Sequence, residues 1–371
     1  MSGSIDAVAA VYAFLGSFLM GSSFLAMKAP AVLKAQVHPV VFQTYRSFWV
    51  FVAGCGFVLA DAVRGEKVVL AFTWWGVLSA VCWIPCGICN FVAMPRLGLA
   101  LTQAVNPGVS VILNFVAGVA LVGQHMKTHG SGGGAFVLAP WYMGGVAMGL
   151  VGMVAAIHAC KRPALDSVEE AIDEESNEPM KDATLAGSGW ALLTGLALAI
   201  LAGVFSTCQF TTLSFGEQSA RAAVGGACVH SFAACPPFLK EQFDNMGSWM
   251  ASFGIGCAMV TAVYYFGAWA VEAARGRQAP PMHFRVMSRY GSAAGLLWVI
   301  GYFFQQAAVV RAGGPAFMQP LNLALQMITS GAWGVFYYRE VSCPRRVVFW
   351  LIAVSMTITF AVLLNAERSA Q

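Results

Sequence analysis

The chain has 371 residues, of which 58% are hydrophobic and 10% are charged. Soluble domains carry about 25% charged residues, so the composition excludes an ordinary soluble protein and is typical of an integral membrane protein surrounded by a lipid bilayer. The formal net charge is +4, but Lys and Arg stand in short clusters between apolar runs, so we expect no continuous basic surface for nucleic acid.

Apolar runs long enough to span a bilayer recur along the whole chain. A hydrocarbon core about 30 Å thick requires roughly 20 apolar residues per helix. No basic segment and no clear cleavage pattern flank the first run, so we expect it to be a retained helix rather than a signal peptide. The sequence therefore predicts an all-α integral membrane protein with ten transmembrane helices, over residues 7–27, 39–60, 69–94, 98–122, 138–159, 187–209, 248–271, 288–310, 313–337 and 346–365.

A polar segment over 161–186 interrupts these runs. It holds eight of the 17 acidic residues and almost no large apolar ones, a composition that predicts a solvated, disordered linker. The linker divides the chain into two predicted five-helix halves, 1–160 and 187–371.

The two halves contain similar stretches. WIPCGICNFVAMPRLG aligns with WVIGYFFQQAAVVRAG at one constant offset, which pairs Trp83 with Trp298, Asn90 with Gln305, Arg96 with Arg311 and Gly98 with Gly313. A shift of two residues then pairs Asn106 with Gln319, and GSSF at 21–24 faces TCQF at 207–210. Because five is odd, the second copy enters the membrane from the opposite side, which gives two inverted repeats as in secondary transporters. The alternative is chance similarity between two apolar stretches.

The distribution of Lys and Arg predicts the orientation. More of them fall on the face that carries the linker than on the face that carries the N-terminus. The positive-inside rule therefore predicts a multi-pass protein with a cytosolic linker and both termini on the opposite side.

Arg46 stands about seven residues into the second predicted helix, where a charge costs up to about 3 kcal/mol on insertion scales. One interpretation is that the guanidinium snorkels to the nearer membrane surface. The other is that it faces the bundle interior and binds a polar or anionic solute. Gln43, three residues earlier on the same side of the helix, favours a polar interior face.

Amide side chains form stripes on two further helices. At about 100° per residue, Gln103, Asn106 and Asn114 share one side of the fourth helix, and Gln319, Asn322 and Gln326 share one side of the ninth. Unpaired amides are costly in hydrocarbon, so the stripes must face other helices or a wet cavity. They either hold helices together or bind hydroxyl groups of a solute, and Trp83 and Trp298 either stack on a sugar or serve as packing residues. The candidate substrate-binding residues are Gln43, Arg46, Trp83, Asn90, Gln103, Asn106, Asn114, Trp298, Gln305, Gln306, Gln319, Asn322 and Gln326.

Other chemistry has little support in the sequence. No Asp or Glu stands well inside a predicted helix, so we expect transport without an obvious proton-carrying carboxylate. Cys82, Cys86 and Cys89 share a helical face but favour packing over a metal site. Cys228 and Cys235 are either free thiols or a disulfide. We find no catalytic grouping, so we expect neither an enzyme nor a cofactor.

Three segments resemble a known family. WGVFYYREVSCPRR (Trp333–Arg346), GSSFLAMK (Gly21–Lys28) and Gln43 resemble the sugar-permease-like branch of the drug/metabolite transporter superfamily, which includes glucose/ribose and rhamnose permeases and related eukaryotic proteins. The resemblance implies a ten-helix inverted repeat and transport of a carbohydrate or related metabolite.

The sequence therefore predicts a secondary transporter of a small polar solute, most readily a sugar. Two alternatives stay open, an exchanger of anionic sugar phosphates or nucleotide sugars and a non-transporting receptor or scaffold that uses the acidic linker. A homodimer is also compatible with the sequence.

Overall fold

The computed structural model describes residues 7–64, 72–121, 123, 125–130, 136–158, 189–224, 247–311, 315–341 and 343–367. The predicted linker 161–186 and both Cys228 and Cys235 lie outside these residues. The elements in chain order are α1 (Ala7–Ser23), η1 (Phe24–Lys28), α2 (Pro30–Lys34), α3 (Pro39–Arg64), α4 (Trp74–Leu97), α5 (Leu99–Ala120), β1 (Thr128–His129), β2 (Phe136–Val137), α6 (Ala139–His158), α8 (Gly189–Val224), α11 (Gly247–Ala274), α12 (Phe284–Arg311), α13 (Pro315–Ala332), η5 (Trp333–Tyr337) and α14 (Pro344–Ala366).

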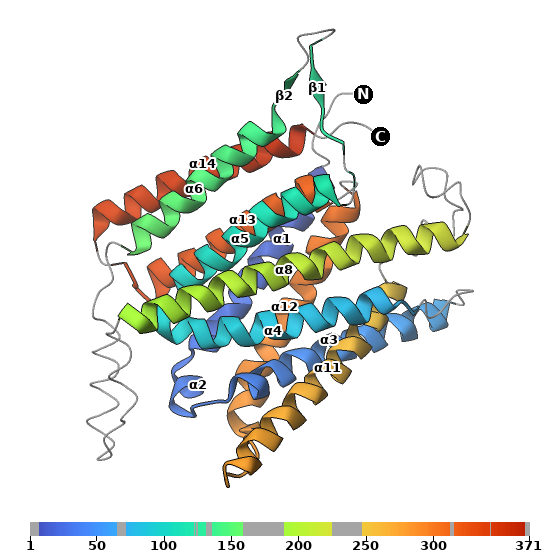
Figure 1. The fold of residues 1–371 in the computed structure, drawn as a ribbon, viewed down its shortest axis with the longest axis vertical. Coiled ribbons are helices and arrows are strands. Elements are labelled where there is room, and N and C mark those ends of the chain that lie inside the picture. The colour runs from blue at the N-terminus through green and yellow to red at the C-terminus, as the bar shows by residue number, and fades with distance from the viewer. Residues whose placement is uncertain are drawn as a thin grey trace.

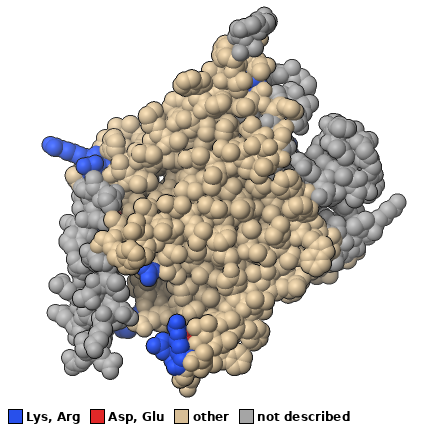
Figure 2. All heavy atoms as spheres, viewed as in Figure 1, with Lys and Arg blue, Asp and Glu red and all other residues tan. Residues whose placement is uncertain are grey.

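The protein is an all-α membrane protein, apart from the short β1–β2 pair. Eight of the described helical stretches are long and apolar enough to cross a bilayer: Ala7–Lys28, Trp74–Leu97, Leu99–Ala120, Ala139–Ile157, Gly189–Thr212, Met250–Ala274, Phe284–Val309 and Pro344–Ala366. The helices α3 and α13 fall outside this set, and these two carry Arg46 and the second amide stripe. Figure 2 shows an almost uncharged face with Lys and Arg near its left and lower margins, as expected for a surface in contact with lipid.

Each predicted span overlaps a described helix, but eight described stretches rather than ten are long and apolar enough to cross a membrane, and several boundaries were wrong. The sixth was expected to end at residue 209, whereas α8 continues to Val224. Hydropathy marks only the apolar part of a helix, and the last turns of α8 contain Glu, Gln and Arg, which are good helix formers despite their polarity. The ninth predicted span is two elements, because α13 passes into the π-helical turn η5.

The helices pack in pairs that join the two halves of the chain. The pairs with the most extensive contact are α4 with α8, α3 with α11, α1 with α12, α5 with α13, and α6 with α14. In Figure 1 the α6–α14 pair lies at one end of the molecule and the α3–α11 pair at the other, with the remaining long helices between them. Elements from both halves therefore surround the centre of the protein.

The α1–α12 contact depends on two glycines. A Cβ added at Gly301 would lie 2.7 Å from the carbonyl oxygen of Gly16, and one added at Gly16 would lie 2.7 Å from the carbonyl oxygen of Gly301. Distances this short leave no room for a methyl group. Small residues of this kind let membrane helices approach backbone to backbone.

We expect Gly301→Ala to lower the stability of the protein by about 1–3 kcal/mol, because the new methyl group forces α1 and α12 apart. The matched control is Gly144→Ala in α6, where an added Cβ meets no atom within 4 Å. Thermal unfolding of both variants in detergent checks this. Equal unfolding midpoints for the two variants would contradict the tight contact.

Candidate solute-binding cavity

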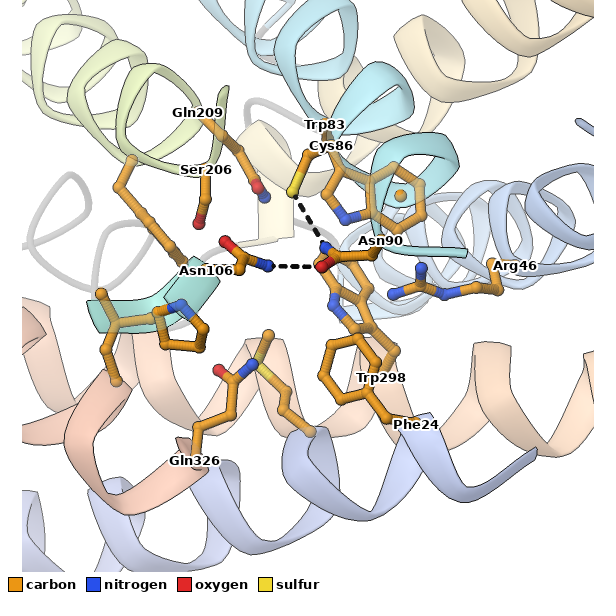
Figure 3. A pocket seen from close by; sticks show the side chains of 15 residues that line it. Phe24, Arg46, Trp83, Cys86, Asn90, Asn106, Ser206, Gln209, Trp298 and Gln326 are labelled. Carbon is orange, nitrogen blue, oxygen red and sulfur yellow. Dashed lines mark hydrogen bonds between the residues drawn. The ribbon is translucent and has the colours of Figure 1, made fainter. Parts of the chain in front are cut away.

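A polar cavity lies where elements from both halves meet. It has a volume of about 30 Å³, and Figure 3 shows its side chains converging from several helices. The residues that line it are Met20, Phe24, Arg46, Trp83, Cys86, Gly87, Asn90, Asn106, Pro107, Ser206, Gln209, Phe210, Trp298, Leu323 and Gln326. Six of the candidate residues from the sequence are among them: Arg46, Trp83, Asn90, Asn106, Trp298 and Gln326.

Arg46 lies at one side of this cavity and is 2% exposed. Its Nη1 donates a hydrogen bond to Gln43 Oε1 at 3.2 Å. Its Cζ lies 5.2 Å from the ring centroid of Trp83, 5.5 Å from that of Trp298 and 5.9 Å from that of Phe24, within reach of cation–π attraction. The guanidinium is therefore held inside the bundle and does not extend to the membrane surface as a snorkelling side chain would.

Gln43 supports Arg46 from the preceding turn of α3 and is itself buried. It approaches α4 so closely that a Cβ added at Gly87 would lie 2.1 Å from Gln43 Oε1. Glycine at position 87 therefore makes room for the amide that accepts the hydrogen bond from Arg46. The Nε2 of Gln43 has no acceptor among the described residues.

The two tryptophans that the sequence alignment pairs are in direct contact. The ring centroids of Trp83 and Trp298 are 4.2 Å apart, and Trp298 stacks on Tyr302 with centroids 4.8 Å apart. Both indoles are buried. They form an apolar wall in contact with Arg46. The two indoles therefore pack against each other and also line the cavity.

Asn90 and Asn106 join α4 to α5 beside this wall. Asn106 Nδ2 donates to Asn90 Oδ1 at 2.9 Å, and Asn90 Nδ2 donates to Cys86 Sγ at 3.6 Å. The Oδ1 of Asn106 is buried and has no donor among the described residues. One acceptor is thus left for a partner in the cavity.

A second amide cluster joins α1, α12 and α13. Gln305 Nε2 donates to Ser17 Oγ at 3.1 Å and to Gln326 Oε1 at 3.4 Å. Asn322 Nδ2 donates to the carbonyl oxygen of Gln305 at 3.2 Å and to Gln319 Oε1 at 3.4 Å. Only Gln326 of this cluster lines the cavity. Gln305 and Asn322 hold helices together, which is the alternative that the sequence left open, whereas Gln319 bonds Asn322 within α13.

The remaining candidates lie away from the cavity lining. Asn114 donates to the carbonyl oxygen and the Oγ of Ser110 in its own helix, at 2.8 and 3.0 Å. Gln103 and Gln306 are fully buried, and their amide atoms have no partner among the described residues. These three residues therefore do not line the cavity.

Sequence reasoning missed Met20, Phe24, Ser206, Gln209 and Phe210 as lining residues. Gln209 is 2% exposed, and its Nε2 has no acceptor among the described residues. The signal that could have identified them was the faint match between GSSF and TCQF, because Phe24 and Phe210 occupy equivalent places in those stretches and both line the cavity.

A cluster around one carboxylate joins the start of α5 to η1 and to the segment after η5. We call it the Glu340 latch: Lys28, Leu99, Ala100 and Glu340. Glu340 forms an ion pair with Lys28, and its two carboxylate oxygens accept hydrogen bonds from the backbone N–H groups of Leu99 and Ala100, each at 2.8 Å. The carboxylate thus satisfies the free N–H groups at the start of α5 and ties α5 to η1 and to the segment after η5.

Metal chemistry has no support in the described part of the chain. It contains no group of three or more His, Cys, Asp or Glu side chains that could hold an ion. Cys82, Cys86 and Cys89 are free thiols on α4.

Comparisons with known proteins bear on the fold. No family model matches the chain, and no curated protein matches it. A solved structure described only as "Crystal structure of protein" is similar over 96% of this chain and 97% of its own, with 14% sequence identity and a TM-score of 0.54. At this identity the likeness concerns the fold alone, and it extends over the full length of both chains.

A double-mutant cycle tests the contact between the two asparagines. We expect Asn90→Ala and Asn106→Ala to be less than additive in unfolding free energy, with a coupling of about 0.6–1.7 kcal/mol, the range for hydrogen bonds between membrane helices. The control pairs Asn90→Ala with Asn114→Ala, because Asn114 bonds within its own helix. Additivity within about 0.3 kcal/mol in the first cycle would contradict the hydrogen bond.

Proposed function

We propose that this protein is a secondary transporter of a small polar metabolite, most readily a carbohydrate, that works by alternating access of two inverted five-helix repeats. The observation that carries the proposal is a buried cavity between the halves, lined by amides and an arginine, in which Arg46 Nε, Asn106 Oδ1 and Gln209 Nε2 have no hydrogen-bond partner among the described residues. Secondary transporters bind their solutes at the interface of such repeats.

The packing pairs support the repeat. Exchanging the halves exchanges α1 with α8 and α4 with α12, so the α1–α12 contact becomes the α8–α4 contact. The same exchange leaves three other pairs unchanged, because each consists of two equivalent helices: α3–α11, α5–α13 and α6–α14. The helix contacts are therefore compatible with an approximate two-fold relation between the halves.

Several residues that line the cavity are also compatible with the approximate two-fold relation between the halves. Trp83 and Trp298, which the sequence alignment pairs, meet at the cavity. Met20 and Ser206 occupy equivalent positions before the two similar tetrapeptides, and both line it. At these positions both halves contribute equivalent residues, although Asn90 and Asn106 line the cavity and their aligned partners Gln305 and Gln319 do not. A cavity shared in this way is compatible with one half rocking against the other about a fixed site.

The small volume of the cavity supports a binding site that widens when the halves move. About 30 Å³ is the space of one or two water molecules, whereas ligand pockets measure roughly 300–1,000 Å³. A sugar fits only after the halves separate on one side. The Glu340 latch is suited to hold one side closed, because it joins η1 of the first half to the segment after η5 of the second.

Counterflow uptake tests transport. We expect proteoliposomes that contain the protein and are preloaded with an unlabelled sugar to accumulate the labelled sugar without a pH gradient. We expect Gln326→Leu to reduce uptake at least about tenfold, because a hydroxyl of the solute loses its partner in a buried site. The control is Ser355→Ala on the exposed side of α14, where Ser355 bonds only its own helix. Uptake unchanged in Gln326→Leu would remove this residue from the solute site.

A crosslink across the latch tests alternating access. We expect the double variant Lys28→Cys/Glu340→Cys to lose transport when its two thiols are joined by a short bis-methanethiosulfonate crosslinker and to regain it on reduction, because the bridge keeps one side closed. The single variants Lys28→Cys and Glu340→Cys are the controls and should keep transport after the same treatment. Undiminished transport in the crosslinked protein would show that this side does not open.

A further inference from the structure

The positive charge of Arg46 has no countercharge among the described residues around the cavity. Of the described residues that line it, Arg46 is the only charged one. The three carboxylates whose side chains the structure describes are bonded elsewhere: Glu272 to Arg275 and Arg277, Glu340 to Lys28, and Glu367 to His129. A charge that is 2% exposed and lacks a counterion is costly in a low-dielectric interior.

The aromatic rings around Arg46 offset part of this cost and fix which part of the group can bind. Phe24, Trp83 and Trp298 lie within 6 Å of its Cζ, on apolar surfaces that accept no strong hydrogen bond. Among the described residues, the only acceptor for its five N–H donors is Gln43 Oε1, and Nε has no acceptor. Donors at the edge of the planar group are therefore left for a ligand.

We infer that the transported solute carries an oxyanion, a carboxylate or a phosphate, beside its hydroxyl groups, and that Arg46 binds this oxyanion through two parallel hydrogen bonds. A guanidinium edge matches the geometry of both oxyanions, and such charge-assisted pairs are among the strongest hydrogen bonds in proteins. The inference rests on the proposed transport function and specifies the class of solute.

The arrangement of polar groups orients this solute. Figure 3 shows Arg46 on one side of the cavity and Asn106 and Gln326 on the other. The oxyanion lies toward α3, and the hydroxyl groups lie toward the amides of α5 and α13. A neutral sugar would leave the guanidinium edge unpaired, which is the condition under which buried polar sites reject a ligand.

The charge also breaks the approximate two-fold relation of the cavity. In α11, which packs against α3, residues 250–271 contain no charged side chain, and Thr261 makes a neutral hydrogen bond to Ser47 at 2.7 Å. Because only one half supplies a cation, a solute with one oxyanion has a single preferred direction in the cavity.

Counterflow with three probes of matched ring size tests the inference: glucose, glucuronate and glucose 6-phosphate. We expect at least one of the two anions to be taken up at least about tenfold faster than glucose, and the two anionic probes distinguish a carboxylate site from a phosphate site. Arg46→Gln should remove the preference. Arg46→Lys should keep only part of it, since an ammonium has the charge but not the planar fork.

The control is Arg285→Gln, which removes an exposed cation at the start of α12 and should leave the preference intact. Size-exclusion profiles and circular dichroism report whether each variant is folded. If Arg46→Gln fails to fold, the ratio of anion uptake to glucose uptake in the unaltered protein decides whether the solute carries an oxyanion. Uptake of glucose as fast as both anions would overturn the inference and leave transport standing. Uptake of none of the three probes would overturn the inference and the transport of sugars together.

Discussion

Hydrocarbon offers no hydrogen bonds, and this constraint accounts for most of the arrangement of the protein. Amides and a guanidinium in a membrane helix must find partners in other helices or in an enclosed polar space. The polar side chains of α3 and α13 are therefore buried, among them Gln43, Arg46 and Asn322, whereas apolar side chains of α3 such as Phe48 and Leu59 are exposed on the surface. The hydrogen bonds that result join α4 to α5, and α1 to α12 and α13.

The same constraint separates two kinds of charge. The ion pairs of Glu272, Glu340 and Glu367 lie at or beyond the ends of long helices, where water and free backbone N–H groups or carbonyls are close. Arg46 is inside a helix and relies on aromatic rings and one glutamine. Those charged residues at helix ends are paired with each other. The Arg46 guanidinium has only Gln43 as a hydrogen-bond acceptor among the described residues.

Close contact between the halves gives the cavity its closed form. Gly16 and Gly301 let α1 and α12 touch backbone to backbone, and the tilted rings of Trp83 and Trp298 meet across the interface. Side chains of one half also pack against glycines of the other, as Tyr45 does at Gly291 and Trp49 at Gly295. The Glu340 latch adds a polar contact between the halves.

The sequence by itself determined the class of protein, the positions of the helices and the identity of the polar residues, because these depend on local composition and on the length that a bilayer imposes. Tertiary structure alone decided which polar residues meet. Asn106 and Asn114 share one stripe of α5, yet Asn106 bonds α4 at the cavity and Asn114 bonds its own helix. Periodicity assigns a residue to a side of its helix, but the neighbour it meets depends on packing between segments far apart in the chain. For the same reason the sequence placed Arg46 in an apolar helix, and only the fold shows that three aromatic rings surround it and that none of the described carboxylates pairs with it.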